Sequence, residues 1–280
     1  MTIDIRALRH RKEKLYGTLM SVFGVIGWLL ILAFIAASIV GGKWQVVAVM
    51  AAEFGIFYLL YLVVGALHRA YVYGHYVMIG PQQFPHLAQM IAEGARQVGL
   101  REAPEAFVYN SGGVMNAFAM RLFGRRYLML TSAIVDADSD EQLRFVIGHE
   151  LGHHAAGHLD WFRNFIKLPA HFVPLLGSAW SRGRELTCDR VGAALSGDLE
   201  SARSALQMLA CGSARLNASM NRVAFEDQER LVPPVAGWFL HILSPYPRHT
   251  ARVRALTAHF GRAGTEAFGG QRPYAPVLAH

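Results

Sequence analysis

The sequence predicts an α+β protein in which an N-terminal transmembrane helical hairpin precedes a mostly helical domain with a small antiparallel sheet. Three observations predict this class: two long apolar runs near the N-terminus, a short region of strand-like segments after them, and several helical segments that follow. Of the 280 residues, 53% are hydrophobic and 17% are charged, and this balance excludes a disordered chain.

The two apolar runs are each long enough to cross a bilayer. Leu15 to Gly42 contains no charged side chain, and Trp44 to Leu67 contains only Glu53. A spanning helix needs about 20 apolar residues, and helices satisfy their own backbone hydrogen bonds in lipid. We therefore expect two transmembrane helices within residues 15–67, in contact with a lipid bilayer. A buried helical hairpin of a soluble protein is the alternative.

Basic residues predict the orientation of these helices. Residues 1–14 contain Arg6, Arg9, Arg11, Lys12 and Lys14, whereas only Lys43 lies between the two runs. Basic segments stay on the cytoplasmic side. We expect a basic cytoplasmic N-terminus and a cytoplasmic domain after the second helix, in a multi-pass protein of a bacterial inner membrane. The 2 cysteines fit a reducing compartment.

The net charge of +7 raises the possibility of a nucleic-acid partner. Five of the 27 basic residues lie in the N-terminal segment, and the others are scattered in small groups. The sequence contains no phosphate-binding glycine loop, zinc-finger spacing or aromatic RNA-binding pattern. We expect anionic lipid head groups, and no nucleic acid, to account for the charge.

Residues 68–260 are predicted to form one domain, followed by a loosely structured tail, 261–280. Apolar periodicity and capping residues predict helices, whereas short apolar or alternating runs between turn residues predict strands. The expected helices are Pro85 to Gly99, Asp140 to His158, Glu185 to Leu195, Leu199 to Cys211 and Arg248 to Phe260. The expected strands are Ala106 to Tyr109, Met115 to Met120 and Arg126 to Ser132.

The segment His149-Glu150-Leu151-Gly152-His153 has a zinc-site pattern. Residues four apart share one face of a helix, so both imidazoles can reach one ion. Glu150 lies beside them, placed to take a proton from a metal-bound water. The alternative is a helix with solvated or structural histidines, the role that we expect for His154 and His158.

A third ligand is expected from Glu185, which shares a helix face with Asp189. Glu185 would bind zinc, and Asp189 would accept a hydrogen bond from a ligand histidine and fix its tautomer. Cys188 is a competing ligand, because it lies about 60 degrees from Glu185 around the helix. A surface helix with two acids is the other alternative. We expect one Zn²⁺ per chain, held by His149, His153 and Glu185.

With these residues in place, the chain resembles the HtpX-like membrane metallopeptidases, which are related to the CAAX prenyl proteases and the thermolysin-like gluzincins. The resemblance rests on the paired apolar runs, Asn116-Ala117-Phe118-Ala119, the His149 to His153 motif, Glu185 with Asp189, and Tyr246-Pro247 with Arg252. It implies a zincin-type metallopeptidase domain for residues 68–260.

The resemblance also implies roles for two further segments. The segment Asn116 to Met120 is implied to be an edge strand beside the cleft, with Asn116, Ala117, Phe118 and Ala119 binding substrate backbone. The late motif usually has histidine before proline, but this chain has Tyr246. Tyr246 and Arg252 are implied to contact substrate and the developing oxyanion. His249 could replace Tyr246, and Arg252 could instead form a salt bridge.

A second departure from the family is the uncharged stretch Leu168 to Ser181, where relatives often carry two more spans. It contains Pro169 and Pro174 and is too short to cross a bilayer. We expect a membrane-dipping hairpin or a hydrophobic flap over the cleft.

The expected function is that of a membrane-bound zinc endopeptidase that cleaves unfolded or membrane-proximal polypeptides. The family suggests protein quality control. The alternatives are a non-hydrolytic scaffold or holdase of the same fold, and a secreted metalloprotease with a signal anchor. The sequence makes no prediction of the oligomeric state.

Overall fold

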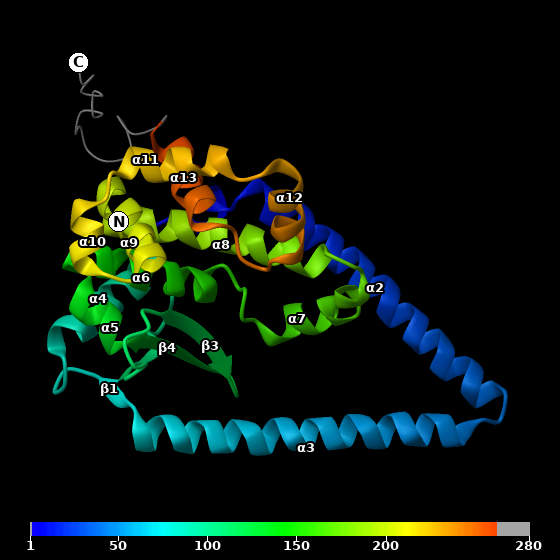
Figure 1. Ribbon diagram of the computed structural model, residues 1–280. Coiled ribbons are helices and arrows are strands. Elements are labelled where there is room, and N and C mark those ends of the chain that lie inside the picture. Colours follow the sequence, from blue (N-terminus) through cyan, green and yellow to red (C-terminus); the bar gives the residue numbers. More distant parts are fainter. Residues whose placement is uncertain (1, 262–280) are drawn as a thin grey trace.

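The computed structural model describes residues 2–261, so the predicted loose tail lies outside the described residues from position 262 onward. The first long N-terminal helix leads away from a helical body, and the second runs back to the side of that body that holds the small sheet (Figure 1). The helices are α1 (Ile5–Leu8), α2 (Arg11–Val40), α3 (Trp44–His75), α4 (Pro85–Gln97), α5 (Ser132–Ala137), α6 (Asp140–Ala155), α7 (Trp161–Lys167), α8 (Leu176–Ser196), α9 (Leu199–Cys211), α10 (Ala214–Ser219), α11 (Arg222–Asp227), α12 (Pro234–Leu243) and α13 (His249–Phe260). The 3-10 helices are η1 (Leu168–Phe172) and η2 (Gln228–Leu231), and the strands are β1 (Val77–Ile79), β2 (Glu105–Tyr109), β3 (Ala117–Leu122) and β4 (Arg125–Thr131).

Helices α2 and α3 are long and apolar enough to cross a membrane. Most of their large apolar side chains are exposed, among them Leu30, Phe57 and Leu67. An apolar surface of this extent is unfavourable in water and marks contact with lipid or another protein. The two helices therefore fit membrane association.

The sheet is mixed, and the predicted antiparallel sheet is wrong for its central pair. The strand order is β1-β2-β4-β3, with β2 and β4 parallel and the other two pairs antiparallel. After β2 the chain passes to the outer edge of the sheet and forms β3 there. A turn at Phe123 and Gly124, both with positive φ, then returns β4 between β3 and β2. As a result, β3 is an edge strand.

The predicted helices of the domain form, but helices α6 and α8 differ in length from their predictions, and α3 extends past Leu67 to His75. Helix α6 begins after a capping box of Ser139 and Gln142, but it ends at Ala155 because Gly157 adopts a φ of +76°. Helix α8 begins at Leu176 and so includes part of the uncharged stretch 168–181, whose other part forms η1. The sequence did not predict strand β1, the short helices α1, α5, α7, α10, α11 and α12, or the two 3-10 helices.

Helices α6 and α8 cross at a close contact between two glycines. A Cβ atom on Gly148 would lie 2.9 Å from the Cα of Gly192, and a Cβ on Gly192 would lie 2.5 Å from the carbonyl oxygen of Phe145. Side chains at these positions would push the helices apart. The crossing therefore brings His149 and Glu185 within reach of each other.

The predicted basic N-terminal segment, residues 1–14, packs on the helical body. The N–H of Ile3 donates to the carbonyl oxygen of Gln97 at 2.7 Å, and Arg190 donates to the carbonyl oxygen of Leu8 at 3.3 Å. Apolar side chains of this segment, Ile3, Ile5 and Leu8, pack against the main core. The segment is thus part of the same packed unit as the domain that follows the two long helices.

Candidate active site

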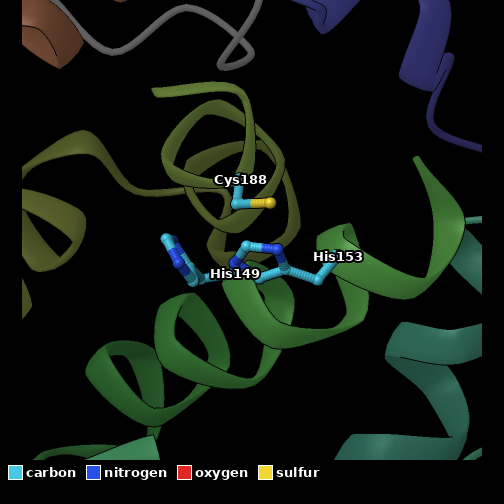
Figure 2. A group of neighbouring side chains, drawn as sticks. All are labelled: His149, His153 and Cys188. Carbon is cyan, nitrogen blue, oxygen red and sulfur yellow. The ribbon is translucent and has the colours of Figure 1, made fainter. Parts of the chain in front are cut away.

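The predicted zinc ligands face one another across the α6–α8 crossing. The Nε2 atom of His149 lies 3.3 Å from Oε2 of Glu185, and Nε2 of His153 lies 3.6 Å from Oε1 of Glu185. Two ligand atoms held about 2.1 Å from a tetrahedral ion are about 3.4 Å apart. The two distances, which end on different oxygens of Glu185, are close to this separation. Figure 2 shows the two imidazoles rising from α6 towards α8.

Cys188 offers a second donor set with the same two histidines. Ligand atoms of His149, His153 and Cys188 all lie within 4.8 Å of one another (Figure 2). The thiol is fully buried, and burial raises its pKa well above the usual range. The third position therefore has two candidate donors, the thiol of Cys188 and the carboxylate of Glu185, whose oxygens face the two Nε2 atoms.

Asp189 lies behind His149, on the side away from Glu185. Its Oδ1 atom is 3.0 Å from Nδ1 of His149. A hydrogen bond from Nδ1–H to this carboxylate keeps the lone pair of Nε2 turned towards Glu185, the arrangement usual for metal-bound histidine. The sequence prediction placed Asp189 in this contact.

Arg252 forms a buried, bidentate ion pair with Asp189. Its Nε and Nη2 atoms donate to the two carboxylate oxygens at 3.0 and 2.6 Å. Burial raises the pKa of Asp189, but Arg252 and the hydrogen bond from His149 outweigh burial and hold that pKa below its usual value. Arg252 thus forms a salt bridge, which is one of the two roles considered for it from the sequence. Its side chain also lines the cleft.

Glu150 lies in the same cleft as the ligand set. Burial raises its pKa to about 7, with His149 opposing the rise and Glu185 adding to it. The backbone of Ala119 in β3 acts in the opposite direction and lowers this pKa, and both residues line the cleft. A carboxylate that takes up and releases a proton near neutral pH is suited to general-base chemistry.

The cleft brings together predicted residues from distant parts of the chain. It has a volume of about 560 Å³. The predicted residues that line it are Asn116, Ala117, Phe118, Ala119, His149, Glu150, His153, Glu185, Tyr246 and Arg252. Asp189 stands behind the lining, and His249, the first residue of α13, is not among the lining residues that the structure describes.

Sequence reasoning missed Arg184 as a residue of the cleft. It lines the cleft beside Glu185, and its guanidinium lies 4.4 Å from the ring centroid of Trp180. Its position next to a predicted ligand was the only signal available. A cation at this place favours binding of a substrate carbonyl or carboxylate.

His154 faces the sheet and not the cleft. Its Nε2 atom is 3.0 Å from the carbonyl oxygen of Tyr127, and burial lowers its pKa to about 4. This histidine is neutral and ties α6 to β4, which agrees with the structural role expected for it.

Part of the chain is similar in sequence to known metallopeptidases. A sequence model of Peptidase family M48 matches residues 81–161, a region that includes His149, Glu150 and His153. Plastoglobule-localized metallopeptidase 48, chloroplastic, of Arabidopsis thaliana is 28% identical over 185 residues, which are 60% of this chain and 53% of that protein. CAAX prenyl protease 1 homolog of Dictyostelium discoideum is 32% identical over 94 residues, 32% of this chain and 22% of that protein. The matched region thus spans about half of the first relative and less of the second. These similarities confirm the resemblance to HtpX-like and CAAX-protease-related metallopeptidases.

Proposed function

We propose, from this similarity to M48 metallopeptidases, that the chain is a membrane-bound zinc endopeptidase. The observation that carries the proposal is that His149, His153 and Glu185 converge at distances suited to zinc in the same cleft as the Glu150 carboxylate. A zinc ion at this place would polarise the scissile carbonyl and acidify a water molecule.

Three side chains in the cleft have separate roles in the proposed reaction. Glu150 takes a proton from the attacking water and later delivers it to the leaving amine. Tyr246, whose side chain is exposed at the cleft, can donate a hydrogen bond to the developing oxyanion. Arg252 holds Asp189 and thereby the orientation of His149.

The substrate is an extended polypeptide. Strand β3 is paired with β4 on one side only, so its other edge has backbone donors and acceptors to offer. A peptide added to this edge is read mainly through its backbone. Asn116 and residues 117–119 line the cleft at this edge. This arrangement favours unfolded or membrane-proximal polypeptides and a role in protein quality control.

The contacts and exposed aromatic side chains of α7 and η1 suggest that the cleft lies close to the bilayer. Nε1 of Trp28 in α2 donates to the carbonyl oxygen of Phe165 at 2.9 Å. Trp28 lies about 20 Å along α2 from Leu15, where the apolar run begins. Trp161 and Phe172 are 69% and 90% exposed. We infer that α7–η1 dips into the membrane beside α2, within a chain that has its N-terminal segment (1–14) and its catalytic domain (68–260) in the cytoplasm.

Removal of the metal is expected to abolish proteolysis reversibly. The full chain, purified in detergent, should degrade casein, lose more than 90% of this activity after treatment with a zinc chelator, and regain it when zinc is restored. Casein cleavage that persists unchanged in the chelator would contradict the zinc mechanism. A zinc-loaded protein that protects casein from aggregation without cleaving it would favour the holdase alternative.

Reporter fusions test the orientation. After His75, the last residue of α3, a reporter that works only in the cytoplasm should be active, and one that works only after export should be inactive. The reason is that the basic N-terminal segment stays inside and that α2 and α3 return the chain to that side. A fusion after Gly42, between the two helices, should give the opposite result. Export of the reporter fused after His75 would place the catalytic domain outside.

A further inference from the structure

Glu13 is a buried carboxylate at the junction between the membrane helix and the catalytic body. It lies in the first turn of α2, in the basic N-terminal segment, and only 3% of it is exposed. Its burial depends on Gly183 of α8, where a Cβ atom would lie 2.6 Å from the backbone nitrogen of Glu13. The start of α2 therefore packs directly against the helix that carries Glu185 and Asp189.

The carboxylate of Glu13 has three polar partners. Its Oε1 atom lies 3.0 Å from Nε2 of His158 and also pairs with Arg9, and its Oε2 atom accepts the hydroxyl of Thr187. His158 is 3% exposed, so both side chains are removed from water. A buried carboxylate with several donors around it is well fixed in position.

The other ring nitrogen of His158 faces a predicted zinc ligand. Nδ1 of His158 lies 3.1 Å from Nδ1 of His153. Sγ of Cys188 lies 3.6 Å from Nδ1 of His158. Two neutral imidazoles in contact share one proton, so one nitrogen donates and the other accepts. The carboxylate of Glu13 determines which nitrogen donates, because it accepts a hydrogen bond from Nε2 of His158 and so requires the proton of that ring on Nε2. Nδ1 of His158 then accepts, Nδ1–H of His153 donates, and the lone pair of His153 remains on Nε2.

We propose that Glu13 is a positioning residue for the zinc site, acting through His158 on His153. The inference rests on the proposed function. It assigns to His153 the same kind of support that Asp189 gives His149, one carboxylate behind each ligand histidine, except that His153 is reached through a second imidazole. The carboxylate that orients His153 comes from the membrane helix.

Zinc affinity of the full chain in detergent, measured by competition with a chromophoric chelator, tests this assignment. Glu13→Met keeps the length of the side chain and removes the acceptor, and it should weaken zinc binding by about 10- to 100-fold and change the visible spectrum of the Co²⁺-substituted protein. Glu13→Gln is the matched control. It removes the charge that pairs with Arg9, as Glu13→Met does, but its amide oxygen still accepts from His158 and Arg9, so zinc affinity should stay within about threefold of the wild type.

A double-mutant cycle separates the relay from a general loosening of the fold. His158→Phe should weaken zinc binding as Glu13→Met does, and Glu13→Met should have no further effect in the His158→Phe background. Additive losses, or wild-type affinity in Glu13→Met, would overturn the inference. If Glu13→Met fails to fold, unchanged affinity in His158→Phe alone overturns it. Absence of zinc binding by the wild type would instead defeat the proposed function.

Discussion

Replacing Glu150 by glutamine is expected to reduce peptide-bond cleavage by about 10²- to 10⁴-fold, the usual contribution of a general base. Glutamine has nearly the same shape but cannot take a proton from water. Glu150 is not one of the three side chains that face the predicted ion, so zinc content should remain that of the wild type. The measurement is the initial rate of casein cleavage together with the zinc content of the same sample.

The control for this variant is Glu141→Gln, an exposed carboxylate in the first turn of the same helix. It should cleave casein at the wild-type rate. Full activity of Glu150→Gln would remove Glu150 from the mechanism, and loss of zinc from Glu150→Gln would mean that Glu150 belongs to the ligand set.

Replacing Glu185 by glutamine is expected to weaken zinc binding by about 100-fold or more and to abolish cleavage. The variant loses the charged oxygens that face Nε2 of His149 and of His153, and a neutral amide is a poor zinc ligand. Cys188→Ala, by contrast, should keep zinc affinity within about threefold, because the proposed third ligand is the Glu185 carboxylate, which faces Nε2 of both histidines.

The Co²⁺-substituted protein gives an independent measure of the same ligand set. Coordination by Glu185 predicts a spectrum without an intense thiolate-to-metal charge-transfer band. The reverse pattern, with zinc lost from Cys188→Ala and kept by Glu185→Gln, would assign the third position to sulfur.

Local periodicity is the reason why so much of the site could be predicted from the sequence. The spacing of His149 and His153, and that of Glu185 and Asp189, each put two side chains on one helix face whatever the rest of the fold does. The approach of the two faces depends on Gly148 and Gly192, whose role as a helix crossing is visible only in three dimensions.

Contacts between distant parts of the chain could not be predicted in this way. Arg252 could pair with any acid, and only the packing of α13 selects Asp189. The sheet prediction was wrong because short strands between turn residues suggest that each strand pairs with the next one in the sequence. In the structure, β3 forms at the outer edge, and β4 then lies between β2 and β3. No sequence pattern links Glu13 to His158, 145 residues away, so this contact could not be predicted.

The close approach of Glu13 to Gly183 bears on how the enzyme can be dissected. The membrane helices look dispensable if they serve only as an anchor, and a trimmed soluble form would be the obvious material for crystallisation or inhibitor screening. On the role proposed for Glu13, such a fragment would lack the carboxylate that orients His153 and would bind zinc less tightly. Weak activity of a trimmed form would then reflect lost metal and would say nothing about the natural substrate.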